Sequence, residues 1–349
     1  MKFIIQPTDR ILITGAGGFI GRRLVRCLLE REFRQVVCLT RPSPQPLQPT
    51  DFAGPHPTDS VAVLAGNLLS PEDCRRIIRD VQVVYHLAAG TGEKSYSDAY
   101  LNSVVTTRNL LEACRQNSGV KRFVNVSSFA VYSTTHRPLG RRLDETWPVE
   151  KQPLTRGQAY CYAKVRQDEW VEEYGRRHQL PYVHVRPGAV YGPGKAPING
   201  RVGLGTFGLF LHLGGGNHPP FTYVDNCAEA IALAGLVPGV DGEVFNVVDD
   251  EPPTSRQFLR RYKREVRRFS SLYVPHFLSY LLCWAWENYA SWSCGQLPPV
   301  YNRNTWRANW KRLRYSNAKL KARLGWRPVV PTAEGLSRYF AACRASTTP

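Results

Sequence analysis

The chain is most constrained near its start, where a short apolar run is followed at once by a cluster of glycines. Residues 10–14 are Arg-Ile-Leu-Ile-Thr, and the next seven are Gly-Ala-Gly-Gly-Phe-Ile-Gly. Apolar residues then recur at helical spacing over 19–31. A glycine turn between a strand and a helix lets backbone N–H groups and the positive end of the helix dipole hold a pyrophosphate. The pattern predicts a dinucleotide-binding turn, with cofactor contacts at Gly15, Gly17, Gly18, Phe19, Ile20 and Gly21.

Three of these glycines are spaced three residues apart, in place of the usual Gly-x-Gly-x-x-Gly pattern. Gly15 allows a tight turn, and Gly18 lets the backbone approach a pyrophosphate closely. Gly21 lets the helix pack against the sheet. The spacing is therefore unusual, but each position has a physical role in such a turn.

Short apolar runs alternate with helical patterns through the first half of the chain, which is typical of βαβ units and a parallel sheet. We expect a doubly wound α/β fold of Rossmann type, with a smaller and mostly helical C-terminal substrate domain. The dinucleotide-binding domain is expected to span 1–193, with 222–250 returning to it. The remainder of 194–349 is expected to bind substrate, and its glycine-rich part, 194–216, suits a flexible lid. The expected strands are 10–14, 36–39, 61–64, 83–87, 123–127 and 182–186, and the proline-rich segment 42–57 is expected to be a surface loop.

The end of the second predicted strand bears on the choice of dinucleotide. An acidic residue there binds the ribose 2′-hydroxyl of NAD, whereas an arginine accommodates the 2′-phosphate of NADP. This chain has Thr40-Arg41 and no acidic residue nearby. The sequence thus favours NADP(H), with NAD(H) as the alternative if Arg41 is only one of many surface arginines.

A tyrosine and a lysine four residues apart on a predicted helix form a candidate proton-transfer pair. The spacing Tyr-x-x-x-Lys occurs at Tyr160/Lys164, Tyr191/Lys195 and Tyr315/Lys319. The second pair spans Gly192-Pro193-Gly194, which excludes a helix. The third lies in the basic C-terminal region with no partner serine nearby. Only the first pair lies on a predicted helix, where residues four apart are neighbours, and it follows a strand ending in Ser127-Ser128.

The chemistry explains this spacing. A tyrosine with an ordinary pKa near ~10 must fall by about 3 units to exchange protons at neutral pH, which costs ~4 kcal/mol. A lysine charge ~4 Å away supplies about that much at an effective dielectric constant of ~20. Tyr160 would then act as general acid or base, Lys164 would lower its pKa and bind the cofactor ribose, and Ser128 would hydrogen-bond the substrate oxygen.

These motifs together resemble the extended short-chain dehydrogenase/reductase family. They are 14–21, His86-Leu87-Ala88-Ala89, Ser127 to Tyr132, Tyr160 to Lys164, Arg186-Pro187-Gly188 to Gly192-Pro193, and Leu324-Gly325-Trp326-Arg327-Pro328. The resemblance covers nearly the whole chain and implies a catalytic triad of Ser128, Tyr160 and Lys164. It also implies cofactor contacts at Asn67, Leu68, Leu87, Ala88, Ala89, Pro187, Gly188 and Val190, with Asn67 standing where the family mostly has Asp.

Within the family, the residues after Ser128 and before the 222–225 run separate the subgroups. Nucleotide-sugar dehydratases carry Asp-Glu where this chain has Phe129-Ala130, and nucleotide-sugar epimerases usually carry an arginine where it has His218-Pro219-Pro220. The string from Phe221 to Asn226 is more similar to the 3β-hydroxysteroid and sterol-4-carboxylate dehydrogenases. The resemblance thus implies an NAD(P)(H)-dependent oxidoreductase that interconverts a secondary alcohol and a ketone on a bulky, largely apolar, steroid- or isoprenoid-like substrate. The alternatives are a nucleotide-sugar epimerase that retains its NAD, and a cofactor-sensing binding protein without turnover.

The chain is strongly basic, with 46 Lys and Arg against 28 Asp and Glu and a net charge of +18. Nucleic acid, an anionic membrane surface, a phosphate-bearing ligand and simple enrichment in arginine all remain open, although no recognised nucleic-acid-binding module appears. The region 255–292 combines clustered arginines with an aromatic, apolar stretch. It is expected either to touch a membrane peripherally or to present a solvated basic face beside the apolar wall of a substrate pocket. A homodimer also stays open.

Localisation follows from the apolar runs and the cysteines. No apolar run reaches the ~18–20 residues that span a bilayer, and the first residues are too short an apolar stretch for a signal peptide. Nine cysteines without a Cys-x-x-Cys pair indicate neither a zinc site nor a disulfide framework. We expect a cytoplasmic protein, with membrane association open, and no metal site.

Overall fold

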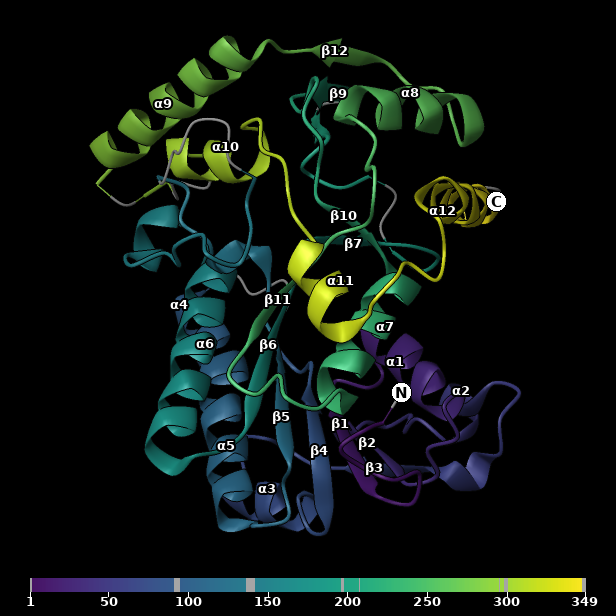
Figure 1. Cartoon of the computed structure of the whole chain (residues 1–349). Helices are drawn as coiled ribbons and strands as arrows, with labels where there is room; N and C mark the ends of the chain where they lie inside the picture. Colours follow the sequence, from purple (N-terminus) through teal and green to yellow (C-terminus); the bar gives the residue numbers. More distant parts are fainter. Residues whose placement is uncertain are drawn as a thin grey trace.

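A parallel β-sheet of seven strands lies at the centre of the part of the chain that the computed structural model describes: residues 2–90, 95–135, 142–195, 198–206, 208–294, 296–297 and 301–346 (Figure 1). The strand order is β3-β2-β1-β4-β5-β6-β11, and each neighbouring pair is parallel. The strands are β1 (Arg10–Thr14), β2 (Val36–Thr40), β3 (Val61–Ala65), β4 (Val81–His86), β5 (Arg122–Val126), β6 (Tyr182–Pro187) and β11 (Val244–Val247). The order reverses between β1 and β4, and ligands of such sheets bind at the carboxyl ends of the strands at this point.

Helices cover both faces of this sheet. On one face, α1 (Phe19–Leu29) packs against α7 (Val224–Leu236), and their apolar sides share a core with Ile11, Ile13 and Val124. On the other face, the core includes Leu12, Val37 and the buried sides of three helices. These are α3 (Pro71–Ile77), α5 (Thr106–Gln116) and α6 (Ala159–His178). Adjacent side chains of β1 therefore point into opposite cores, as the alternation of side chains along a strand requires. The predicted doubly wound α/β fold is confirmed.

Short segments complete this half of the molecule. The proline-rich segment 42–57 contains one helical turn, α2 (Thr50–Ala53), and a 3₁₀ turn, η1 (Thr58–Ser60), follows. A π-helical turn, η2 (Tyr100–Val105), links α4 (Tyr96–Ala99) to α5. The segment between β5 and α6 contains two further 3₁₀ turns, η3 (Phe129–Val131) and η4 (Pro153–Arg156).

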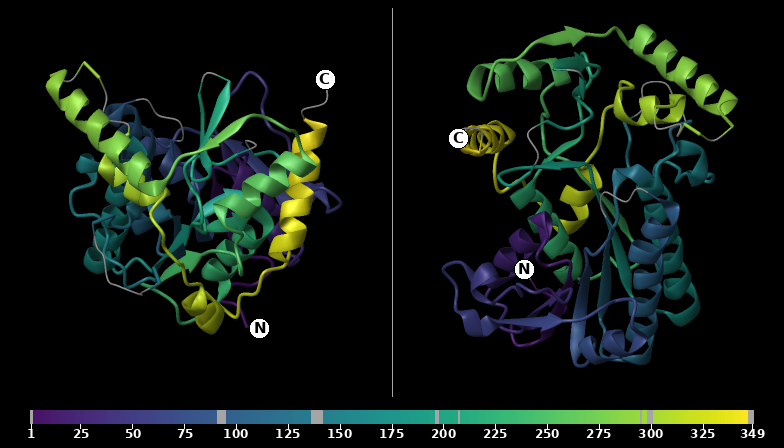
Figure 2. Two further views of the ribbon diagram at one scale, coloured as in Figure 1. Left: turned by 90° about the horizontal axis from the view of Figure 1, so that it is seen from above. Right: turned by 180° about the vertical axis from the view of Figure 1, so that it is seen from behind.

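The C-terminal elements lie beyond the carboxyl ends of the strands (Figures 1 and 2). A two-stranded parallel sheet joins β7 (Ala189–Tyr191) to β10 (Phe221–Tyr223), and a three-stranded sheet joins β8 (Gly203–Thr206), β9 (Leu209–His212) and β12 (Ser271–Tyr273). Much of the glycine-rich segment 194–216 is thus a hairpin of β8 and β9. The helices are α8 (Ser255–Glu265), α9 (His276–Trp292), α10 (Arg303–Asn309), α11 (Ala318–Leu324) and α12 (Thr332–Ala345). Leu320, Leu324 and Trp326 around α11 return to the core beside α7.

No helix in the described part of the chain combines the length and hydrophobicity that a membrane span needs.

Candidate functional site

The turn after β1 has the shape of a phosphate cradle. Gly15 has a φ of +72°, and a Cβ there would lie 2.9 Å from the Ala88 nitrogen at the end of β4. A Cβ on Gly21 would clash with the Gly15 carbonyl oxygen and approach the Ala16 oxygen to 2.6 Å. Gly18 stands at the N-cap of helix α1 and has no side chain. No side-chain hydrogen bond therefore caps the first N–H groups of this helix. These features fit a bound pyrophosphate.

The closeness of Gly21 to this turn gives a testable consequence. We expect Gly21→Ala to push α1 away from the turn and to weaken NAD(P)H binding about tenfold, because overpacking costs about 1–3 kcal/mol. Fluorescence titration with NADH and NADPH measures the change. Gly205→Ala is the matched control, since a Cβ at Gly205 meets nothing within 4 Å. Equal affinities for the two variants would contradict the cradle.

A buried histidine joins the ends of β1 and β4 beneath the cradle. His86 Nδ1 lies 2.8 Å from Thr14 Oγ1, and its Nε2 lies 2.8 Å from Thr107 Oγ1 on α5. Burial, with a smaller contribution from the Lys164 charge, lowers the pKa of His86 to about 3, so the ring is neutral and serves as a fixed hydrogen-bonding link. The Ala88 N–H donates to Thr14 Oγ1 at 3.2 Å. The predicted contacts Leu87 and Ala88 thus lie beside the glycine turn, and Ala89 is the next residue of the chain.

The remaining predicted cofactor residues lie at other strand ends. Arg41 directly follows β2 and is exposed. Asn67 is exposed after β3, where its Oδ1 accepts from the Leu69 N–H at 3.0 Å, whereas Leu68 is buried in the core. Beyond β6, a Cβ on Gly188 would collide with the Pro220 carbonyl oxygen. Of the other predicted contacts, Pro187 is the last residue of β6, and Val190 is half-buried in β7.

The three predicted catalytic residues come from the end of β5 and the start of α6. Tyr160 lies in the first turn of α6, and Lys164 lies one turn later. Lys164 is only 3% exposed, and its Nζ donates to the Val126 carbonyl at 2.8 Å. Ser128 follows two residues after Val126, and its Oγ accepts from the Ala130 N–H at 3.1 Å. The structure therefore holds the lysine at the strand end that carries the serine, and the triad stays a prediction that this placement supports.

The other two Tyr-x-x-x-Lys pairs do not share a helix. Tyr191 lies in β7 and Lys195 in the turn that follows. Tyr315 lies before α11, whereas Lys319 lies on that helix and forms an ion pair with Glu243. Neither pair places a phenol and an ammonium on neighbouring turns.

A buried carboxylate that the sequence analysis did not single out ties α6 to the sheet. Asp168 lies one helical turn after Lys164 and accepts from Asn125 at 2.8 Å and Ser127 at 2.9 Å. It also forms a buried ion pair with Arg186 of β6 at 2.9 Å. Burial acts to raise the pKa of Asp168, but His184, Arg186 and the Ser127 hydrogen bond hold it below its ordinary value. This network fixes the helix of Tyr160 and Lys164 against the two strands next to it.

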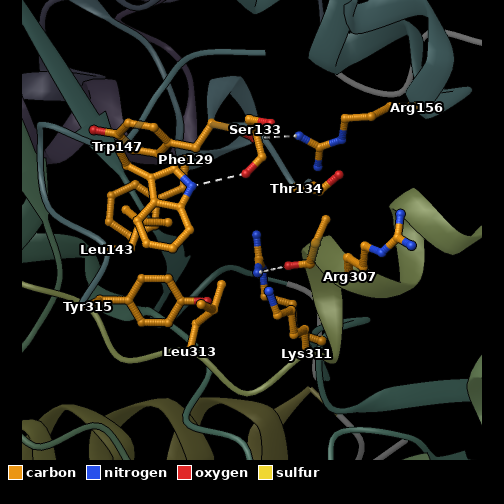
Figure 3. A pocket seen from close by; sticks show the side chains of 13 residues that line it. Phe129, Ser133, Thr134, Leu143, Trp147, Arg156, Arg307, Lys311, Leu313 and Tyr315 are labelled. Atoms are coloured by element: carbon orange, nitrogen blue, oxygen red, sulfur yellow. Dashed lines mark hydrogen bonds between the residues drawn. The ribbon is translucent and has the colours of Figure 1, made fainter. Parts of the chain in front are cut away.

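A pocket begins at Phe129, the residue after Ser128. Figure 3 shows an apolar, mostly aromatic side, where Phe129, Trp147 and Tyr315 gather, facing a cationic side with Arg156, Arg307 and Lys311. The Phe129 and Tyr315 rings stack with centroids 5.4 Å apart. The complete lining among the described residues is Phe129, Tyr132, Ser133, Thr134, Leu143, Trp147, Arg156, Arg201, Arg307, Ala308, Lys311, Leu313 and Tyr315, with no Asp or Glu.

Two of the cations of this pocket are held by backbone carbonyls inside the fold. Arg156 is 3% exposed and donates to the carbonyls of Ala130 and Tyr132. Arg201 donates to the Ala308 carbonyl at 2.7 Å. Burial lowers the pKa of Arg201, and the charge of Arg156 lowers it further, because like charges repel each other there. A negative ligand group would relieve this repulsion.

Helix α10 connects the pocket to the outermost helix of this end of the molecule. Arg307 lines the pocket and also donates to the hydroxyl of Tyr280 on α9 at 3.2 Å. One residue earlier, the Trp306 indole donates to Ser279 Oγ at 2.8 Å. The same short helix therefore contributes to the pocket wall and supports α9.

The chain is similar to several known enzymes. The 3beta-hydroxysteroid-dehydrogenase/decarboxylase isoform 1 of Arabidopsis thaliana is 26% identical over 97% of this chain and 80% of that protein. The 2-alkyl-3-oxoalkanoate reductase of Stenotrophomonas maltophilia (strain K279a) is 29% identical over 72% of this chain and 74% of that protein. Among solved structures, the UDP-glucose 4-epimerase of Thermus thermophilus in complex with NAD superposes with a TM-score of 0.69 at 26% identity, over 97% of this chain and 99% of that one.

Fold similarity extends to more distant enzymes. The UDP-glucuronic acid 4-epimerase of Bacillus cereus, in complex with UDP-glucuronic acid and NAD, gives a TM-score of 0.72 at 20% identity, over 97% of this chain and 99% of that one. The sequence model of the NAD dependent epimerase/dehydratase family matches residues 11–247. The expected family and the expectation of an enzyme are therefore confirmed. The two UDP-sugar epimerase structures contain NAD, and one of them also contains UDP-glucuronic acid. This chain belongs to the NAD dependent epimerase/dehydratase family.

Proposed function

We propose that this protein is an NAD(P)(H)-dependent oxidoreductase that interconverts a secondary alcohol and a ketone, with Ser128, Tyr160 and Lys164 as the catalytic residues. One observation carries the proposal. Lys164 is buried one turn after Tyr160, with its ammonium on the Val126 carbonyl at the strand end that leads into Ser128. This strand end lies next to β4 and one strand away from the glycine cradle of β1.

In the mechanism, Tyr160 transfers the proton, and Lys164 and Ser128 support this transfer. The buried ammonium of Lys164 favours the phenolate of Tyr160, which lets the tyrosine give a proton to, or take one from, the substrate oxygen. Ser128 donates a hydrogen bond to that oxygen and stabilises negative charge developing on it. The glycine turn and the ends of β2, β3, β4 and β6 would hold the dinucleotide, and its nicotinamide would supply or accept the hydride.

The aromatic side of the pocket, whose described lining does not include Ser128, Tyr160 or Lys164, favours a substrate with an apolar body. Phe129, Trp147 and Tyr315 offer flat apolar surface directly after the catalytic serine. The relatives named above act on a 3β-hydroxysteroid and on a 2-alkyl-3-oxoalkanoate, which carry a hydroxyl or keto group on an apolar skeleton. We therefore propose a steroid- or isoprenoid-like alcohol or ketone as the substrate.

The cationic side of the same pocket favours a second candidate, a nucleotide-sugar epimerase. Four cationic side chains and no carboxylate among the described lining residues would suit a diphosphate. Two solved structures with this fold are UDP-sugar epimerases with NAD. An epimerase retains its cofactor through the cycle, because the hydride returns to the same substrate.

A cofactor and substrate panel separates the two candidates. The purified protein is incubated with NADH or NADPH and a series of steroid ketones, alkyl ketones and UDP-sugars, and nicotinamide absorbance is followed. We expect stoichiometric consumption of the reduced cofactor with an apolar ketone, and freely exchanging cofactor in the purified protein. Tightly bound NAD, together with conversion of a UDP-sugar without net consumption of cofactor, would contradict the oxidoreductase and support the epimerase.

We propose NADP(H) as the preferred dinucleotide, because exposed Arg41 directly follows β2, where the adenosine ribose of such folds lies. Arg41→Ala is expected to raise the KM for NADPH about tenfold and to leave that for NADH nearly unchanged, since only the 2′-phosphate loses its charged hydrogen bond. Steady-state kinetics with both cofactors measures this. An equal effect on both, or none, would make Arg41 an ordinary surface arginine.

A further inference from the structure

Helix α9 has its apolar residues on the outside. The side chains that it buries are small, Ser279, Cys283 and Ala290, and they face α10 and its surroundings. The large apolar side chains point outward instead, with Phe277 76% and Trp292 77% exposed. The other exposed large apolar residues of α9 are Leu278, Leu281, Leu282, Trp284, Trp286 and Tyr289. A helix that packs through small residues and exposes leucine and tryptophan is the reverse of an ordinary surface helix.

The exposed apolar surface continues beyond the helix into β12. Leu272 and Tyr273 of that strand are also exposed. Within 276–292, Glu287 is the one residue among Asp, Glu, Lys and Arg, and it is paired with Arg303 of α10 at 2.8 Å. Contiguous apolar patches of this kind mark a surface that another phase or partner covers.

A basic hollow lies next to this apolar surface along the chain. It is lined by the second half of α8 and the turn after it: Arg260, Lys263, Arg264, Arg268, Phe269 and Ser270. Arg264 and Arg261 both form ion pairs with Glu265. The side chains of Arg260, Arg267 and Arg268 are exposed. The hollow thus offers several cations around one aromatic ring, which suits a phosphate group.

The apolar and basic parts lie at one end of the molecule. Figure 1 shows α8, β12 and α9 along the end opposite α3, and the other views agree (Figure 2). A surface with an aromatic, apolar strip beside a cluster of arginines is complementary to an anionic bilayer, where the strip enters the interface and the arginines meet lipid phosphates.

We propose that α8, β12 and α9 form a peripheral docking surface for an anionic lipid membrane. The outward residues of α9 and β12 insert at the interface, and the basic hollow of α8 binds a phosphate headgroup. This inference concerns where the protein works and holds whichever substrate the pocket accepts.

Vesicle sedimentation tests the proposal with the full-length protein. We expect binding to phosphatidylcholine vesicles that contain phosphatidylglycerol, weak binding to phosphatidylcholine alone, and loss of binding as salt is raised. Phe277→Ser with Leu281→Ser should abolish binding without changing the melting temperature, because both side chains are exposed. Leu154→Ser with Val329→Ser removes two exposed apolar side chains elsewhere and should leave binding intact.

A charge variant tests the second half of the surface independently. Arg260→Gln with Arg268→Gln should weaken binding to the anionic vesicles by more than about tenfold. Arg75→Gln with Arg79→Gln removes the same charge at the opposite end of the molecule and should have little effect. No binding by the unmodified protein would overturn the proposal. So would a dimer in light scattering that Phe277→Ser with Leu281→Ser converts to monomer while vesicle binding is absent, because the surface would then join two copies of the chain.

Discussion

Replacing Tyr160 by Phe is expected to lower kcat by about 10³-fold, the usual size of a positioned proton-transfer group. The substitution removes one oxygen from the first turn of α6 and leaves the ring, so the helix and the Lys164 contact with Val126 should persist. Turnover is measured under saturating cofactor with the substrate that the panel identifies. Binding of NAD(P)H, followed by fluorescence, should change little.

Tyr162 provides the control on the same helix. Its ring contacts the ring of Tyr96. The residue four positions later is Arg166, whose guanidinium lies over the Tyr162 ring. Tyr162→Phe removes the same oxygen two residues away and should keep nearly full turnover. Comparable activity of the two variants would remove Tyr160 from the catalytic triad.

Asp168→Asn is expected to destabilise the protein by about 3–5 kcal/mol, because it leaves the buried Arg186 guanidinium without its counter-charge. Asp168 accepts from Asn125 and Ser127 and pairs with Arg186 at 2.9 Å, and all of these groups are buried. Urea denaturation measures the change in the free energy of unfolding. Glu169→Gln, which breaks the exposed pair with Arg166, should cost no more than about 1 kcal/mol. Similar costs for both variants would show that the buried pair is not a major source of stability.

The pH dependence of this effect has a definite sign. The pKa of Asp168 is held below that of an unfolded aspartate, which is about 3.9. Its contribution is therefore fully present above the unfolded pKa and is lost as the pH falls through the folded pKa. The stability difference between the unmodified protein and Asp168→Asn should stay constant near neutral pH and shrink below about pH 4.

Local periodicity was enough to predict the central sheet and the glycine turn. Strands such as Val36–Thr40 are continuous apolar runs because helices cover both of their faces, and that signal needs no knowledge of distant residues. The position of Tyr160 and Lys164 on one helix also follows from local spacing. The segment 194–216 was harder, because glycines that suggest a flexible lid also permit the tight pairing of β8 with β9, where a Cβ on Gly203 would collide with the Leu211 carbonyl.

The pocket cations could not be found from spacing, because they come from distant segments of the chain. Arg156 and Arg201 are held by carbonyls of distant segments, and Arg307 is held by the Tyr280 hydroxyl. Nothing in their local sequences distinguishes these three from the many other arginines. The Asp168 network was missed for a similar reason. Its partners lie on β5 and β6, and the pattern of α6 alone suggests only a polar helix.

The support of α9 by α10 bears on how an apolar substrate would reach the pocket. Arg307 lines the pocket and also donates to the Tyr280 hydroxyl, so α10 connects the pocket to α9, the helix proposed to dock on a membrane. A sparingly soluble alcohol or ketone dissolved in the bilayer could be taken up by lateral diffusion, without first crossing water. Turnover of such a compound should then follow its mole fraction in the vesicle and not its bulk concentration.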